Sequence, residues 1–282
     1  MVTIRDVARE ARVSVATVSR VLNGSGPVRE ETRRLIREVA GRLRYVPHGG
    51  ARSLITRRTD TIGVLLPDLY GEFFSEVIRG MDGAAQRHGF HLLISSSHSD
   101  KHELEAAMRA MRGRVDGVVV MSPDLDAESL LNIPRSLPVV LLCSSPGSDA
   151  PDSLTIDNSR GARAMVRHLL ALGHQRIAII KGASRNYDAA ERLRGYRQAL
   201  READIRPARD VERDGGFTES GGYAAALALL NVRPRPTAIF AANDSMAIGA
   251  LSALRQSGVQ VPGEIAVAGF DDIPLARYLD PP

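Results

Sequence analysis

Residues 3–23, TIRDVAREARVSVATVSRVLN, predict two short helices joined by a tight turn. Apolar residues recur with the three-and-four spacing of one helical face, first before and then again after the turn at Arg12-Val13. Thr3 and Ser14 stand immediately before these two patterns, where a side-chain oxygen can cap the first turn of a helix. The residues expected on the buried faces are Ile4, Val7, Ala8 and Ala11 in the first helix and Val18, Val21 and Leu22 in the second.

A third helix is predicted from about Arg29 to Leu43, after the helix-breaking run at 23–27. Its buried side is expected to consist of Thr32, Leu35, Ile36, Val39 and Leu43. Two short helices across a tight turn, supported by a third, form the helix-turn-helix plan. The outward side chains of the second helix are short enough to approach base edges in a major groove, where Ser19 and Arg20 supply hydrogen-bonding groups. A three-helix bundle without a nucleic acid partner is the alternative.

Charge is unevenly distributed along the 282 residues, whose formal net charge is +4. The first 60 residues contain thirteen arginines, no lysine and six acidic residues, a balance of +7, whereas the remainder carries −3. A basic N-terminal module on a near-neutral body indicates binding to a polyanion, although charge alone also fits a solvated basic face.

The composition excludes several classes of protein. With 44% hydrophobic and 25% charged residues the chain is globular, and its length favours two or three domains. No apolar run approaches the ~20 residues that span a bilayer, and Arg5 and Asp6 lie where a signal peptide would be apolar. Cys143 is the single cysteine, which excludes an intrachain disulfide and a multi-thiolate metal site. We expect a cytoplasmic protein without membrane contact.

The run VTIRDVAREARVSVATVSRVLNGSGPVREETRRLIREVAGRLRYVPH (2–48) resembles the DNA-binding headpiece of the LacI/GalR (lactose-repressor) family of bacterial regulators. The match is dense and ungapped, and TIRDVA, VSVATVSRVLN and LRYVP carry most of it. The resemblance implies that Val15 and Ala16 set operator preference, with further contacts from neighbouring residues. The complete set of expected DNA contacts is Thr3, Ser14, Val15, Ala16, Thr17, Ser19, Arg20, Asn23 and Leu54.

The same resemblance places a short hinge helix after this module. Residues 51–54, ARSL, match its A-R-x-L core, which makes Leu54 the residue expected to enter the minor groove and kink the duplex. Gly49-Gly50 departs from the family pattern, and two glycines cost a helix about 2 kcal/mol relative to alanine. We therefore expect a hinge that is disordered without DNA. A plain linker with one exposed leucine is the alternative.

From Thr61 onward, short apolar runs alternate regularly with helical patterns, which predicts open, doubly wound parallel α/β sheets. A break in the alternation near 150–157 predicts two such lobes. The expected strands are 61–66, 90–95, 116–121, 138–142, 176–181, 237–241 and 265–269, and the expected helices are 73–88, 102–111, 159–172, 187–203, 219–230 and 244–257. The predicted domains are 1–47 (DNA-binding), 48–60 (hinge), 61–155 (first lobe) and 156–282 (second lobe).

In open α/β sheets, ligands bind beyond the carboxyl ends of the strands, so two facing lobes predict a polar cleft like that of periplasmic sugar-binding proteins. The family resemblance continues through IDNSRGARAMVRHLLALGHQRIAII and PTAIFAANDSMAIGAL. It implies a set of effector contacts consisting of Phe73, Phe74, Asp188, Arg192, Phe217, Asn243 and Asp271. Their chemistry suits a sugar-like effector, because carboxylate, amide and guanidinium groups bind hydroxyls and a phenyl ring covers a sugar's C–H face.

Structural roles for these residues remain open on the sequence. Phe73 and Phe74 also fit a core at a helix start, and Arg192 also fits a surface ion pair with Glu191 or Asp188. Asn243-Asp244 also fits a helix cap. A purine or amino-acid effector is a further alternative to a sugar.

The sequence lacks the phosphate-binding and nucleophile motifs that would indicate an enzyme or a cofactor. His98 and His102 are four apart but straddle a predicted strand-to-helix junction, so we expect no metal site. The favoured interpretation is a homodimeric repressor that binds a pseudo-palindromic operator and a small effector. The alternatives are a solute-binding protein without DNA function and an α/β enzyme such as a sugar kinase. Family members typically continue beyond the stretch that ends here at Pro282, so we expect the C-terminal part of the family core to be missing.

Overall fold

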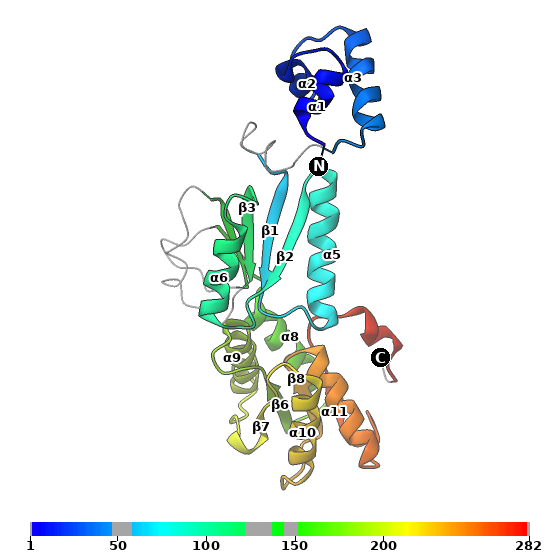
Figure 1. Ribbon diagram of the computed structural model, residues 1–282. Coiled ribbons are helices and arrows are strands. Elements are labelled where there is room, and N and C mark those ends of the chain that lie inside the picture. Colours follow the sequence, from blue (N-terminus) through cyan, green and yellow to red (C-terminus); the bar gives the residue numbers. More distant parts are fainter. Residues whose placement is uncertain (1, 47–57, 122–136, 144–151, 281–282) are drawn as a thin grey trace. The chain divides into compact units, whose positions relative to one another are not determined.

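The computed structural model describes residues 2–46, 58–121, 137–143 and 152–280 (Figure 1). The chain divides into two compact units. One extends through Thr61 and includes Arg112–Asp116, and the other contains Ile62–Met111 and the chain from Gly117 onward. Among its described residues, the first unit contains the helices α1 (Ile4–Glu10), α2 (Val15–Leu22) and α3 (Glu30–Arg42).

The two predicted caps are present at the starts of α1 and α2. The Asp6 carboxylate accepts hydrogen bonds from the backbone nitrogen of Thr3 at 2.9 Å and from its hydroxyl at 2.7 Å, and these bonds lower the pKa of Asp6. Ser14 Oγ accepts from the backbone nitrogen of Thr17 at 3.1 Å. Arg12 turns the chain between the helices with a φ of 53°, in the left-handed region. The helix-turn-helix is therefore confirmed together with the local interactions that start each helix.

The core of the three helices contains one fully buried side chain from each, namely Val7, Val18 and Ile36. One expected core residue of α3 is wrong, because Leu35 is 44% exposed. A helix advances about 100° per residue, which places Leu35 on the flank of the arc that Ile36 and Val39 centre on the core.

The second unit begins with a five-stranded sheet in the order β2-β1-β3-β4-β5. The pairs β1–β3, β3–β4 and β4–β5 are all parallel. Helices α5 (Glu72–Arg87) and α6 (Lys101–Met111) follow the first two strands (Figure 1). The strands are β1 (Thr61–Leu66), β2 (His91–Ser96), β3 (Gly117–Met121), β4 (Val139–Leu142) and β5 (Asp152–Leu154).

A second parallel sheet follows, in the order β7-β6-β8-β9. Its strands are β6 (Ile177–Lys181), β7 (Glu212–Asp214), β8 (Ala238–Ala241) and β9 (Ala266–Ala268). Its helices are α8 (Asn158–Ala171), α9 (Tyr187–Glu202), α10 (Glu219–Leu230) and α11 (Asp244–Gln256). The chain also forms short 3-10 helices at Arg209–Val211 and Pro274–Tyr278.

Both faces of the second sheet are covered by helices. Alternate side chains of a strand point to opposite faces, so a strand buried on both faces is apolar throughout. Ile177, Ile179 and Phe240 pack with residues of α8 and α9, whereas Ala178, Ile180 and Ile239 pack with residues of α10 and α11. The predicted fold class, a helix-turn-helix followed by two doubly wound α/β lobes, is confirmed.

Two strands were not predicted from the sequence: β5, which lies within the break near 150–157, and β7. The three residues of β7, Glu-Arg-Asp, carry no apolar pattern, and it pairs only with β6 at the edge of the sheet. The strand lies there because Ile179, Ile180 and Lys181 provide a free parallel edge, not because of its own β propensity.

Helices α10 and α11 pack closely enough to exclude a methyl group at their contact. A Cβ atom at Gly249 would overlap the backbone oxygen of Glu219 and lie 2.7 Å from the backbone nitrogen of Tyr223. We expect Gly249→Ala to lower the free energy of unfolding by about 2 kcal/mol or more, because backbone atoms cannot move aside as a side chain can. Urea unfolding followed by circular dichroism measures this.

The matched control is Gly80→Ala on α5, where nothing lies within 4 Å of the added carbon. This variant should be neutral or more stable by up to about 1 kcal/mol, since alanine is the better helix former. Equal effects of the two substitutions would refute the packing argument.

Candidate functional site

The outward face of α2 presents the side chains that the sequence predicts at DNA. Val15 is 41% exposed, and Ala16 and Arg20 are also exposed. Thr17 and Ser19 are partly buried, the latter accepting a hydrogen bond from Asn23 Nδ2 at 3.2 Å. Short side chains and one arginine thus form a convex surface that a major groove can admit.

Of the other predicted DNA contacts, three lie at the ends of helices and one lies outside the described residues. Thr3 and Ser14 start α1 and α2, and Asn23 ends α2. Capping leaves Thr3 and Ser14 at helix N-termini, where a phosphate can also be bound. Leu54 and the expected hinge core at 51–54 lie outside the described residues.

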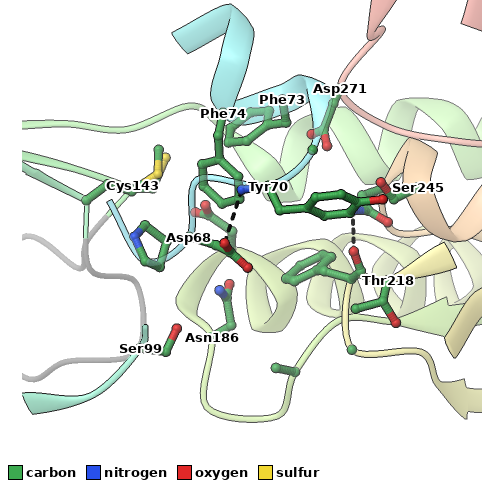
Figure 2. A pocket seen from close by; sticks show the side chains of 18 of the residues that line it. Asp68, Tyr70, Phe73, Phe74, Ser99, Cys143, Asn186, Thr218, Ser245 and Asp271 are labelled. Carbon is green, nitrogen blue, oxygen red and sulfur yellow. Dashed lines mark hydrogen bonds between the residues drawn. The ribbon is translucent and has the colours of Figure 1, made fainter. Parts of the chain in front are cut away.

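A pocket of about 280 Å³ lies at the carboxyl ends of strands from both sheets. All seven residues predicted to contact an effector line this pocket. Figure 2 shows the rings of Tyr70, Phe73 and Phe74 near polar side chains that include Asp68 and Asn186. The described lining consists of Pro67, Asp68, Tyr70, Gly71, Phe73, Phe74, Ser99, Met121, Cys143, Ala183, Asn186, Asp188, Arg192, Gly216, Phe217, Thr218, Glu219, Asn243, Ser245 and Asp271.

The Arg192 side chain is fixed by a set of polar partners and is 5% exposed. Its Nε donates to Asn158 Oδ1 at 2.8 Å, and its Nη1 donates to the carbonyl oxygen of Ala242 at 2.5 Å. Its Nη2 lies 3.1 Å from Asp271 Oδ1. The surface ion pair considered from the sequence is therefore wrong: Glu191 pairs with Arg194, and Arg192 points inward.

Aromatic rings enclose the same guanidinium. Its central carbon lies 3.9 Å from the ring centroid of Phe270 and 5.7 Å from that of Phe217. These distances allow cation–π attraction, which is stronger where the cation is desolvated. Arg192 therefore has a single orientation, and it is held at the pocket wall before any ligand arrives.

The carboxylates beside Arg192 are buried and interact with one another. Burial raises the pKa of Asp271 to about 7; Arg192 opposes this shift and Asp244 adds to it. Burial also raises the pKa of Asp188, against Arg192 and against hydrogen bonds from Cys143 and Asn158. The bond from Asn158 Nδ2 to Asp188 Oδ1 is 2.7 Å long. Asp188, Asn158, Arg192 and Asp271 thus form one continuous polar chain.

Two pocket residues have left-handed backbone conformations that non-glycine residues rarely adopt. Phe217 has a φ of 65° and Asp271 a φ of 109°. Such conformations cost about 1–3 kcal/mol each and persist where the surroundings hold them, commonly at ligand sites. The Phe217 ring contacts Arg192 on the pocket wall, while Asp271 Oδ1 has no well-aligned hydrogen bond among the described residues. A ligand hydroxyl could supply that bond.

Asn243, Phe73 and Phe74 line the pocket and also have the structural roles that the sequence left open, a helix cap and core packing. Asn243 Oδ1 caps α11 by accepting from the backbone nitrogen of Met246 at 2.9 Å, as expected. Its amide nitrogen donates to the carbonyl oxygen of Phe217 at 3.2 Å. Phe73 and Phe74 are partly buried and pack edge to face, with centroids 5.4 Å apart, against the core of the first sheet.

Several lining residues were not singled out from the sequence. Tyr70, Ser99 and Cys143 follow β1, β2 and β4, and Thr218 and Ser245 lie at the starts of α10 and α11. The strand-end rule could have directed attention to these loops. This rule does not specify which side chain of a loop points into the pocket, because the backbone geometry of the turn determines the direction of each side chain.

The described residues contain neither a candidate metal site nor a membrane-spanning helix. No group of three or more His, Cys, Asp or Glu side chains there is arranged to hold a metal ion. Burial raises the pKa of the Cys143 thiol to about 12, with Asp188 adding to the shift. No described helix has the length and apolar character required to cross a membrane.

Comparisons with known proteins match both parts of the chain. Residues 3–48 match the model of the lacI family of bacterial regulatory proteins, and residues 166–282 match a periplasmic binding protein-like domain. The HTH-type transcriptional regulator GalS of Salmonella typhimurium is 40% identical over 284 aligned residues, which cover 100% of this chain and 83% of GalS.

This chain belongs to the LacI family of bacterial regulatory proteins.

Solved LacI-family structures share its fold over nearly the whole length. The lac repressor dimer bound to operator and the anti-inducer ONPF has a TM-score of 0.87 at 31% identity, covering 98% of this chain and 84% of the repressor. The complex of the regulator CelR with cellobiose has a TM-score of 0.71 at 33% identity, covering 100% of this chain and 86% of CelR.

The raised pKa of Asp271 predicts how the stability of this LacI-family protein depends on pH. A carboxyl whose pKa is higher in the folded state binds more protons when folded, so the free energy of unfolding falls as pH rises. The fall should extend from the ordinary pKa of 3.8 to about 7 and then stop. Asp271→Asn should lack this contribution, so its unfolding free energy relative to wild type should rise across that window by at most ~1.4 kcal/mol per pH unit.

Urea unfolding at a series of pH values measures the difference. Asp82→Asn controls for the loss of an exposed carboxylate, because Asp82 lies at an exposed position on α5. A constant difference between Asp271→Asn and wild type from pH 4 to 8 would contradict the assigned pKa.

Proposed function

We propose that the chain is a sequence-specific DNA-binding repressor, acting as a homodimer and controlled by a small, uncharged, sugar-like effector. The observation that carries the proposal is the pairing of an exposed α2 face with a separate polar pocket in one LacI-family chain. On this proposal the protein is not an enzyme, and it acts in the cytoplasm, where the DNA lies.

Support for DNA binding comes from the N-terminal module. Arg20 is exposed on α2, and the first 60 residues carry thirteen arginines. Arginine can bind guanine with two hydrogen bonds in the major groove, and a basic surface attracts phosphates. The similar lac repressor structure is a dimer bound to operator, and a symmetric dimer matches a pseudo-palindromic site.

Support for an uncharged effector comes from the charges around the pocket. The described lining contains four acids, Asp68, Asp188, Glu219 and Asp271, and one base, Arg192. Arg192 already has three partners within the protein. An anionic ligand would face net repulsion here, whereas hydroxyl groups can donate to the carboxylates. The rings of Phe73, Phe74 and Tyr70 suit the apolar face of a sugar, and CelR, a relative, binds cellobiose.

The alternatives have less support. A solute-binding protein without DNA function would leave the capped, arginine-rich helix-turn-helix unexplained. A sugar kinase requires a loop that binds phosphate, and the sequence contains no such motif.

The DNA-binding proposal is tested with duplexes selected from a random pool by the wild-type protein. Arg20→Ala should weaken binding to the selected duplex by about tenfold or more, since a lost base or phosphate contact costs ~1–3 kcal/mol. Arg201→Ala removes the same charge from an exposed position on α9 and should change the affinity little. Fluorescence anisotropy at fixed salt measures both. Indistinguishable variants would refute a role for α2 in DNA recognition.

The effector proposal is tested by thermal shift with neutral mono- and disaccharides and their phosphorylated counterparts. At least one neutral sugar should raise the melting temperature, because a ligand at 100 times its Kd stabilises by about 2.7 kcal/mol. Asp271→Asn should reduce that shift. Stabilisation by a phosphorylated sugar but not by its neutral parent would contradict the charge argument.

A further inference from the structure

The chain enters the α/β core at a carboxylate that fixes its backbone. Asp116 Oδ1 accepts from the backbone nitrogen of Thr59 at 2.7 Å and from its hydroxyl at 2.8 Å. Asp116 Oδ2 accepts from the backbone nitrogen of Asp60 at 2.9 Å. In return, the Asp116 backbone nitrogen donates to the carbonyl oxygen of Thr61 at 2.8 Å. Four hydrogen bonds therefore join Asp116 to three consecutive residues.

The lowered pKa of Asp116 and the backbone conformation of Asp60 both indicate that these hydrogen bonds hold the backbone in place. Burial acts to raise the pKa of Asp116, but the hydrogen bonds from Thr59 and Asp60 outweigh it and lower the pKa below its ordinary value. Asp116 is therefore an anion at neutral pH, the state in which both oxygens accept hydrogen bonds. Asp60 has a φ of 50°, in the left-handed region, which requires local contacts to maintain it in a residue other than glycine.

Asp116 immediately precedes a strand whose last residue lines the pocket. The next residue, Gly117, begins β3, and Met121 at the end of that strand lines the pocket. Thr59 and Asp60, which donate hydrogen bonds to Asp116, lie much earlier in the sequence, directly after the segment that connects the DNA-binding helices to β1. Along the chain, five residues of one strand therefore separate Asp116 from the segment that follows β3.

We propose that Asp116 is a positioning residue that fixes the core end of this connecting segment and thereby sets the affinity for operator DNA. The inference rests on the proposed DNA-binding function. Backbone that is held before binding does not have to be ordered when DNA binds, so the hydrogen bonds of Asp116 reduce the entropic cost of association.

The direction in which Asp116→Asn changes operator affinity distinguishes a positioning role from a simple effect of charge. Asp116→Asn removes a negative charge, which by itself strengthens attraction to DNA. It also replaces one acceptor oxygen with a donor, so one of the hydrogen bonds from Thr59 and Asp60 is lost. We expect Asp116→Asn to weaken binding to the selected duplex about tenfold, the amount that follows from releasing roughly one residue of backbone.

Asp82→Asn is the matched control, because it removes the same charge at an exposed position on α5. It should leave the affinity unchanged or slightly higher. The slope of log Kd against log salt should be equal in wild type and Asp116→Asn, since the phosphate contacts are unaltered. A purely destabilising effect would instead lower the fraction of active protein without raising the Kd of the active fraction.

Thr59 allows one of these hydrogen bonds to be removed without changing charge. Thr59→Val deletes the hydroxyl that donates to Asp116 and should weaken operator binding, whereas Thr59→Ser retains that donor and should restore most of the affinity. In Asp116→Asn, the further change Thr59→Val should have a smaller effect than it has alone, as expected for interacting residues.

Amide hydrogen exchange tests the arrangement without DNA. In Asp116→Asn the amides of Thr59 and Asp60 should exchange faster than in wild type, with no such change in Asp82→Asn. Unchanged exchange at these amides, or operator affinity that is unaltered or higher in Asp116→Asn, would overturn the proposal. Loss of duplex binding by wild type as well would instead refute the DNA-binding function, and the exchange result would still decide whether Asp116 holds the segment.

Discussion

A buried guanidinium organises the end of the second sheet that faces the pocket. Arg192 on α9 contacts Asn158 of α8, the carbonyl oxygen after β8 and the carboxylate of Asp271 after β9. A buried ion pair is a weak source of stability, because desolvating both charges offsets their attraction. Apolar side chains of similar size often stabilise a protein interior at least as well as such a pair. The arrangement is therefore better explained by what it presents to the pocket: a fixed donor group, a strained Asp271 and an aromatic wall.

The exposed face of α2 and the polar pocket of the α/β lobes are formed by different physical effects. In the small helix-turn-helix, Ser14 caps α2, and Val18 and Val21 bury its inner face. Val15, Ala16 and Arg20 on its outer face remain exposed. The α/β lobes instead gather polar side chains because parallel strands all end at the same edge. Asp116 belongs to neither surface, and its hydrogen bonds control how firmly the connecting segment is held at its core end.

Much of the fold could be predicted from the sequence because its signals are local. Apolar runs marked nearly every strand, and the seven predicted effector residues were found around one pocket. The sequence was a poor guide where contacts with distant residues determine whether a strand forms or a side chain is buried. Strand β7 has no apolar residue, Leu35 lies just beyond the edge of a buried arc, and the sequence left a surface ion pair open as the alternative for Arg192. Asp116 gave no signal, because its three partners lie more than fifty residues earlier in the chain.

The central claim is that the pocket and the DNA-binding helices are energetically coupled. The most direct measurement is the operator Kd with and without a saturating neutral sugar, together with the sugar Kd with and without operator. Thermodynamic linkage requires both ratios to be the same factor, which we predict to be at least about fivefold. An operator affinity that is identical in the presence and absence of a sugar bound in the pocket would contradict the account.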